Sequence, residues 1–417
     1  MGDLRGSGQA EAWARRLAAE PYGHRVRRPV TPDGPDEFDL TYVRTGPRGG
    51  TPVLVLPGGP GVASVLPYRS LRRLAAARGL DVIMVEHRGI GLSRCDDAGR
   101  DLPLVAVTVE QVVADLAAVL DHAGVRRAVV YGSSYGTYLA QGFGVQHPDR
   151  VAGMVLDSPM FGPRDLPLVR AHQRGLLWDG ATAETARVAA LLRALLADGL
   201  VIPESAGAVV PVVYEFGGPR VLGRLLDGVR EGRAVRTWEW VASLGPREVD
   251  GPGTRFLVEP DLVGGISYGE LDYGAPPDGH PLDPQVVFAP AAARNPPFTG
   301  EPYDLPTSIG AFDWPTAVVS GERDLRTPRP RAEEVVERIP GAVLVPLPAL
   351  GHSALDTHVL AALHVAHAAA EGAHRRLPAL APRIAALPRR GASGHLGRMI
   401  AAALAAERWA PRHHPAV

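Results

Sequence analysis

The sequence contains no lysine and only one cysteine among its 417 residues. Because Cys95 has no second cysteine to pair with, no disulfide bond within the chain is expected. The sequence has no run of about 18 apolar residues that could span a bilayer. Residues 1–20 also lack the apolar core of a secretory signal peptide. We therefore expect a soluble, cytoplasmic protein.

The chain carries almost no excess charge, with a formal net charge of -1 at pH 7. Nucleic acids and anionic membrane surfaces attract proteins that carry a marked positive charge, so we expect this protein to bind neither. A peptide or a small molecule with an acyl group is the expected partner. No pattern in the sequence indicates an oligomeric state.

Strand and helix patterns alternate along the first half of the chain, which favours an α/β fold with a mostly parallel sheet flanked by helices. Helical spacing of apolar residues and a capping pattern at Thr108 and Gln111 predict one of the helices clearly. Short apolar runs predict strands at residues 24–30, 37–44, 51–56, 81–85, 128–131 and 151–156. Predicted helices lie at residues 68–78, 108–124 and 137–147.

The alternation of strand and helix stops at about residue 160 and resumes near residue 307. The intervening segment is helical at first and then rich in proline and glycine, which indicates a largely helical cap (lid) inserted into the core. We thus predict an α/β core at 1–159 and 307–375, and a cap at 160–306. Residues 376–417 form a C-terminal tail of unknown role, with at most one further helix near residues 396–409.

The pattern Gly-x-Ser-x-Gly occurs at residues 132–136 and places Ser134 between a predicted strand and a predicted helix. A sharp turn of this kind presents a nucleophilic serine in serine hydrolases. The same pattern recurs at residues 265–269, which makes Ser267 an alternative nucleophile. Ser267 is followed by acidic residues and glycine, not by a helix, and lies in the predicted cap. We therefore favour Ser134.

A serine hydroxyl needs an imidazole to take its proton, and the imidazole needs an acid to orient it. His352 follows a predicted strand in a short loop, and Asp324 follows another strand 28 residues earlier. Both side chains are expected at the edge of the sheet where Ser134 lies. Asp157, also at the end of a predicted strand, is the alternative acid.

Two backbone N–H groups are needed to stabilise the oxyanion that forms when the serine attacks. We expect one from Tyr135, which directly follows Ser134. The other is expected from Gly59 in the Pro-Gly-Gly-Pro-Gly loop at residues 57–61, because glycine lets the backbone approach a substrate closely.

These features together resemble the proline iminopeptidase and tripeptidyl aminopeptidase family of α/β-hydrolases. The resemblance implies release of an N-terminal residue or short peptide through an acyl-enzyme, with no cofactor and no metal. Pro57 stands where many members have His, and Glu86-His87 stands where they have Asp-Gln. The matching segments are Gly58-Gly59-Pro60-Gly61, residues 86–93, residues 132–136, residues 324–328 and Gly351-His352.

Members of this family hold the free amino group of the substrate with carboxylates of the cap. The resemblance assigns this role to Glu270, with Glu215 and Glu239 as further candidates. An esterase, amidase or thioesterase acting on a small metabolite with the same triad is an alternative function. A binding protein on a hydrolase scaffold is a more remote one. A dehalogenase or epoxide hydrolase would need Asp in place of Ser134.

Overall fold

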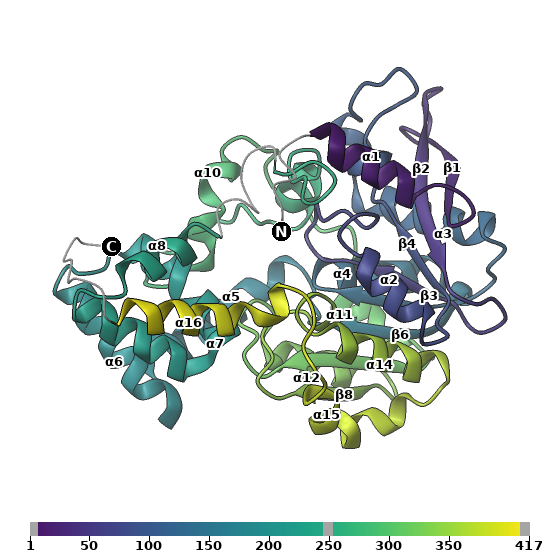
Figure 1. The fold of residues 1–417 in the computed structure, drawn as a ribbon. Coiled ribbons are helices and arrows are strands. Elements are labelled where there is room, and N and C mark those ends of the chain that lie inside the picture. The colour runs from purple at the N-terminus through teal and green to yellow at the C-terminus, as the bar shows by residue number, and fades with distance from the viewer. Residues whose placement is uncertain (1–6, 245–252, 409–417) are drawn as a thin grey trace.

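The computed structural model describes residues 7–244 and 253–408, and an eight-stranded sheet forms its centre (Figure 1). The strand order is β1-β2-β4-β3-β5-β6-β7-β8. Strands β1, β2 and β4 pair antiparallel, and all the other neighbours pair parallel, so the predicted mostly parallel sheet is confirmed. The strands are β1 (Gly23–Pro29), β2 (Glu37–Thr45), β3 (Val53–Leu56), β4 (Val82–Val85), β5 (Ala128–Ser133), β6 (Val151–Asp157), β7 (Thr316–Gly321) and β8 (Val343–Leu347).

Helices cover both faces of the sheet because successive side chains of a strand point to opposite faces. In β5, Val130 belongs to one apolar cluster, whereas Val129 and Tyr131 belong to the other. One face is covered by α3 (Val109–His122), α4 (Tyr135–Gln146) and α12 (Arg329–Arg338). The other is covered by α2 (Arg69–Ala76), α14 (Val359–Ala370) and α15 (Leu377–Ala385). Helix α1 (Ser7–Leu17) precedes β1, and the short α13 (Ala354–Thr357) precedes α14.

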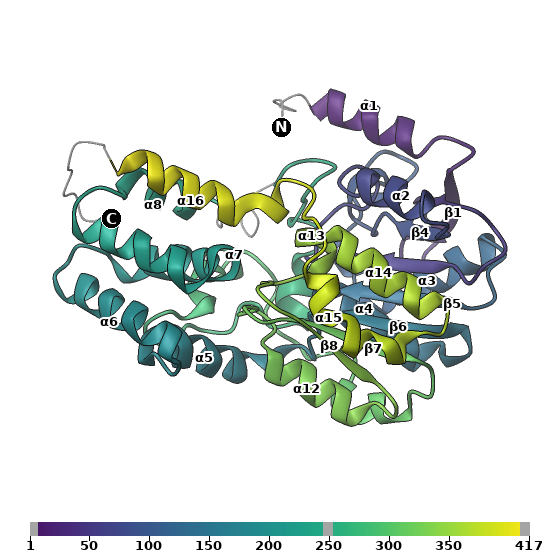
Figure 2. The same cartoon turned by 60° about the horizontal axis from the view of Figure 1, so that its bottom comes forward.

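The segment between β6 and β7 holds most of the remaining helices, where the sequence predicts the cap. The helices that span residues 183–242 lie beside the sheet in Figures 1 and 2, and a separate apolar cluster joins them. The longest helix of the segment, α7, is kinked at Gly218, which has a non-helical φ of 73°. Gly218 packs against the side chain of Arg323. The helices are α5 (Leu166–Arg174), α6 (Ala183–Ala197), α7 (Pro203–Arg230), α8 (Val235–Ala242), α10 (Ala289–Ala292) and α11 (Leu305–Ser308).

The C-terminal part contains two α-helices, so the prediction of at most one was wrong. Pro378 and Pro382 obscured α15, but its Leu377 and Ile384 are buried against the sheet layer. The one helix predicted here, near residues 396–409, is confirmed as α16 (Leu396–Glu407), while 409–417 lie outside the described residues. Figures 1 and 2 show α16 lying along α7 and α8, where Ile400 is fully buried in the cap cluster. The tail therefore crosses from the sheet layer to the cap.

Within residues 7–244 and 253–408, no helix combines the length and the apolar character needed to cross a bilayer.

Candidate active site

Ser134 lies in the sharp turn between β5 and α4, as the sequence predicts. Its backbone has φ 53° and ψ -121°, a conformation that L-residues rarely adopt. The flanking glycines are required by close backbone contacts. A Cβ atom on Gly132 would lie 2.1 Å from the Gly136 carbonyl oxygen, and one on Gly136 would lie 2.1 Å from that of Leu56. The tight packing of this turn holds the strained serine at the carboxyl edge of the sheet.

Asp324 and His352 are brought together by the loops that follow β7 and β8. The Nδ1 atom of His352 lies 3.0 and 3.1 Å from the two carboxylate oxygens of Asp324. Asp324 also accepts hydrogen bonds from the backbone N–H groups of Arg326 and Thr327 and from the Thr327 hydroxyl. The buried carboxylate is thus fully engaged and holds the imidazole in one orientation.

The charges of this pair support each other. Burial opposes the charge on Asp324, but the attraction and hydrogen bond of His352 outweigh burial and lower the pKa of Asp324. Burial likewise opposes the charge on His352, and Asp324 outweighs it and raises the pKa of that imidazole above its usual value. A more basic imidazole is better able to take a proton from a serine hydroxyl.

The serine turn and the histidine loop are joined through the residues next to Ser134 and His352. The Oγ atoms of Ser133 and Ser353 lie 2.8 Å apart, and both side chains are buried. The alternative acid, Asp157, is buried, and its carboxylate binds the backbone beyond His352 instead of the imidazole ring. The geometry therefore favours Asp324 as the partner of His352.

The Gly-rich loop predicted to hold the oxyanion lies directly over the serine. A Cβ atom on Gly58 would be 3.1 Å from the Cβ atom of Ser134, and Gly59 has a φ of 118° that favours glycine. The chain just beyond this loop is fixed at residues 64–65. Their N–H groups donate to Glu86, and their carbonyls accept hydrogen bonds from Arg72.

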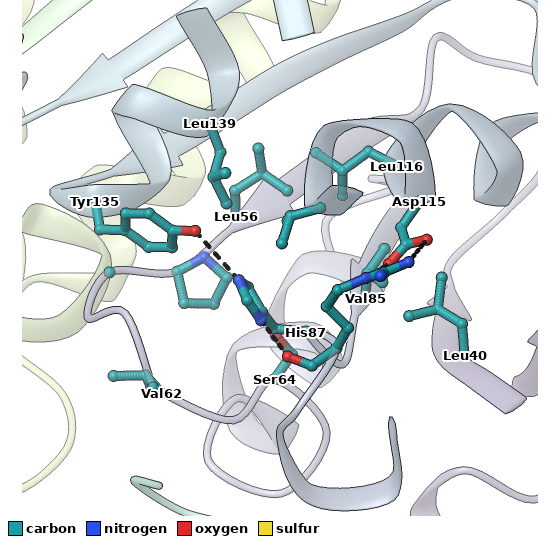
Figure 3. A pocket seen from close by; sticks show the side chains of 15 residues that line it. Leu40, Leu56, Val62, Ser64, Val85, His87, Asp115, Leu116, Tyr135 and Leu139 are labelled. Carbon is teal, nitrogen blue, oxygen red and sulfur yellow. Dashed lines mark hydrogen bonds and ion pairs between the residues drawn. The ribbon is translucent and has the colours of Figure 1, made fainter. Parts of the chain in front are cut away.

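Tyr135 is predicted to supply the other oxyanion N–H group, and Figure 3 shows its side chain lining a pocket together with His87 and Leu139. The Tyr135 hydroxyl lies 3.2 Å from Nε2 of His87, whose Nδ1 lies 2.6 Å from the Arg88 carbonyl oxygen. Burial lowers the pKa of His87 to about 4, so the ring is neutral near pH 7. Because a carbonyl only accepts, Nδ1 carries the proton and the tyrosine hydroxyl donates to Nε2. The side chain next to the serine is thus held in place.

The three candidate carboxylates of the cap have different surroundings. Glu270 is half-buried and accepts a 2.8 Å hydrogen bond from the backbone N–H of Val109, at the start of α3. Burial raises the pKa of Glu270 to about 7. Burial first, and then the charge of Glu270, raise the pKa of Tyr135, which places Glu270 within electrostatic reach of the residue after Ser134.

The other two candidate carboxylates, Glu215 and Glu239, have surroundings that differ from those of Glu270. Glu215 is buried in α7, where it accepts a hydrogen bond from the Leu325 N–H and approaches Arg326 at 3.5 Å. It therefore contacts the loop that carries Asp324. Glu239 is exposed on α8. The alternative nucleophile, Ser267, is buried in a short helical turn at Gly265–Glu270, in which its N–H donates to the carbonyl of Val263.

Several residues of the site were not found from the sequence. Thr327 could have been, because Asp-x-x-Thr after a strand is a common turn in which the aspartate accepts from the backbone. Arg72 and Glu86 bind the backbone of residues 64–65, just beyond the Gly-rich loop. Glu86 belongs to the matching segment at residues 86–93, but no local pattern marks this contact or Arg72. Ser158, which accepts a 2.9 Å hydrogen bond from the N–H of Ser353, is equally hidden because its partner is distant in sequence.

Comparison with known proteins identifies relatives of this chain. Residues 51–202 match the family model described as alpha/beta hydrolase fold. A probable proline iminopeptidase of Streptomyces coelicolor is 28% identical over 230 residues, which cover 53% of this chain and 61% of that relative, less than two thirds of its length. A probable proline iminopeptidase of Leptolyngbya boryana is 24% identical over 326 residues, 78% of this chain and 88% of the relative.

A solved structure with a similar fold is a thermophilic esterase from Thermogutta terrifontis. It is 20% identical, with a TM-score of 0.46, and the match covers 84% of this chain and 99% of the esterase.

Proposed function

Because the chain is a serine hydrolase of the α/β-hydrolase fold and is similar to proline iminopeptidases, we propose that it is an aminopeptidase. It releases an N-terminal residue, of the proline type, or a short peptide. The reaction passes through an acyl-enzyme on Ser134. The proposal draws on the names of the relatives and on the position of Glu270.

In the proposed mechanism, the Ser134 hydroxyl attacks the scissile carbonyl while Nε2 of His352 takes the hydroxyl proton. Asp324 accepts the Nδ1 proton in a hydrogen bond and stabilises the resulting imidazolium. The N–H groups of Tyr135 and Gly59 donate to the oxyanion. His352 then returns the proton to the leaving amine, which breaks the peptide bond and leaves the acyl group on Ser134. Water, activated by the same imidazole, hydrolyses this ester.

The observation that carries the peptide assignment is the half-buried carboxylate of Glu270. It accepts one hydrogen bond, from the N–H of Val109, among the described residues, so the carboxylate can accept further donors. Burial disfavours its charge, as the pKa of about 7 indicates. A substrate ammonium would offset this cost by pairing with the carboxylate. The free α-amino group of a peptide is therefore the ligand that best suits this position.

A panel of substrates tests the proposal. Proline, alanine and tripeptidyl anilides with a free amine are compared with their N-acetylated forms and with p-nitrophenyl esters. We expect kcat/KM to be at least about tenfold higher for free than for acetylated anilides, the loss expected for one charged hydrogen bond. Hydrolysis of esters without hydrolysis of free-amine anilides would instead identify an esterase-type enzyme. No reaction with any substrate or with a fluorophosphonate would indicate a binding protein.

A further inference from the structure

The end of strand β6 lies between the elements that carry the three proposed catalytic residues. In the sheet, β6 has β5, which leads to Ser134, on one side and β7, which leads to Asp324, on the other. Asp157 is the last residue of β6, and Ser158 follows with a φ of 60°. Both side chains are buried. Two buried polar side chains at such a position need partners, and both find them in the chain that follows His352.

Asp157 contacts both the serine turn and the histidine loop. Its backbone carbonyl accepts a 2.9 Å hydrogen bond from the N–H of Ser134. Its carboxylate accepts hydrogen bonds from the N–H groups of Ala354 (3.0 Å) and Leu355 (2.8 Å), in the first turn of α13. This turn begins two residues after His352. One residue thus fixes the backbone at Ser134 and the backbone that follows His352.

Ser158 connects the histidine loop to the acid. Its hydroxyl oxygen accepts a 2.9 Å hydrogen bond from the N–H of Ser353. Against burial, which raises the pKa of Asp324, a hydrogen bond from the Ser158 hydroxyl is among the contacts that lower it. The hydroxyl therefore lies within electrostatic reach of Asp324 and accepts a hydrogen bond from the residue after His352, so it links the acid to the histidine loop.

We infer that Asp157 and Ser158 are positioning residues that set the placement of Ser134, His352 and Asp324 relative to one another. The inference rests on the proposed function of those three residues. Neither side chain contacts the substrate or the imidazole ring in this role. Displacement of reacting groups by about 1 Å can cost about 100-fold in rate, so a small change in these contacts has a large kinetic effect.

The carboxylate of Asp157 is chemically required for this role. A third donor, the hydroxyl of Tyr131 at 2.9 Å, joins the two backbone N–H groups, so the side chain accepts three hydrogen bonds and donates none. An asparagine has one acceptor oxygen and an NH₂ group. The NH₂ group is itself a donor, and it would replace an oxygen that now accepts from the backbone N–H groups or from the Tyr131 hydroxyl. The Asp157→Asn variant should therefore shift the histidine loop while keeping nearly the same shape.

The test measures the rate of fluorophosphonate labelling at Ser134, together with kcat and KM. For Asp157→Asn we expect the labelling rate and kcat to fall about 10- to 100-fold, with KM changed less than about threefold. Asp81→Asn is the matched control. Asp81 is also a buried aspartate, and it is bonded to Arg44. It lies just before β4, at the amino end of that strand, whereas the site lies at the carboxyl ends of the strands. Its labelling rate should stay within about twofold of the wild type.

A second variant keeps the test decisive if Asp157→Asn does not fold. Ser158→Gly removes the hydroxyl while glycine accepts the positive φ without strain. We expect labelling to slow about three- to tenfold, the loss expected for one or two hydrogen bonds. Folded variants that react at the wild-type rate would overturn the inference. Absence of labelling at Ser134 in the wild type would overturn the proposed function instead, and labelling without peptide hydrolysis would overturn only the aminopeptidase assignment.

Discussion

At the carboxyl edge of the sheet, Asp157 and Asp324 each accept three or more hydrogen bonds, whereas Glu270, in the segment predicted as cap, accepts one from the residues that the structure describes. The two aspartates are buried, and Glu270 is half-buried. A carboxylate whose oxygens are all engaged can orient its neighbours but has little capacity for a ligand. A carboxylate that accepts only one hydrogen bond still has acceptor capacity for a ligand. The difference separates residues that position the chemistry from a residue suited to recognise the substrate.

Glu215 shows that the difference between the carboxylates depends on their contacts, and not on whether they lie in the segment predicted as cap. It lies on α7, in the segment predicted as cap, but it is buried and accepts a hydrogen bond from the N–H of Leu325, next to the proposed acid Asp324. A Cβ atom on Gly351 would lie 3.0 Å from the Glu215 Cβ atom. Glu215 therefore behaves like the aspartates of the sheet edge and ties the cap to both loops of the acid–histidine pair.

The largest effect is expected for Ser134→Ala. Removing a serine nucleophile from a triad costs about 10⁴- to 10⁶-fold in kcat, because the acyl-enzyme no longer forms. Covalent labelling by a fluorophosphonate should disappear as well. Ser267→Ala is the control, and we expect its labelling to remain. Labelling that is lost in Ser267→Ala and retained in Ser134→Ala would identify Ser267, in the segment predicted as cap, as the nucleophile.

A smaller and more selective effect is expected for Glu270→Gln. Loss of one charged hydrogen bond costs about 1.5–3 kcal/mol, so KM for free-amine substrates should rise about 10- to 100-fold. Esters should be unaffected. Glu204→Gln, on the exposed start of α7, is the control. Equal effects of Glu270→Gln on amines and esters would show that Glu270 does not recognise the amine, and the contrast between cap and edge would fail.

The pH dependence of KM sharpens the same prediction. The pKa of Glu270 is raised to about 7, so its carboxylate is charged above that pH. A peptide α-amino group with a pKa of about 8 is charged below pH 8. KM for free amines should therefore be lowest between these values and rise as the pH falls through 7. In Glu270→Gln this rise on the acid side should be absent, which a KM profile between pH 5.5 and 9 measures.

The smallest effect on the chemistry is expected for Ile400→Ala in α16. Truncating a fully buried isoleucine costs about 2–5 kcal/mol, and here the loss falls on the packing of α16 against the cap. Hydrogen exchange should reveal faster opening of α7 and α16, while labelling at Ser134 changes less than about threefold. Met399→Ala, at an exposed neighbouring position, should leave both unchanged. Loss of labelling in Ile400→Ala would mean that the sheet edge depends on the cap more than their contacts indicate.

The core and the main residues of its site could be predicted from the sequence because their signals are local. The strand before Ser134, the helix after it and the loops with Asp324 and His352 each carry a short pattern, and β1 to β6 lie where the apolar runs placed them. The resemblance was also confirmed, since proline iminopeptidases are among the relatives. Parallel strands then bring these loops together at one edge.

The remaining features depend on contacts between distant residues. Asp157 binds residues almost 200 positions away, so its end-of-strand position could suggest an acid but not its actual partners. Two prolines concealed α15, although a helix tolerates proline in its first turn and tertiary packing can override one further along. The contacts of Glu215 could not be predicted, because they depend on where α7 lies in space, and the periodicity of the sequence does not define that position.

The packing of α16 on the cap has a consequence for synthesis of the protein. About 150 residues separate the end of α8 from the start of α16, and they include strands β7 and β8. At about 5–20 residues per second, a ribosome needs roughly 8 to 30 seconds to make them. During that time the apolar side chains of α7 that pack with Ile400 lack this partner in the nascent chain. The cap is thus begun before the sheet is finished and completed only after it.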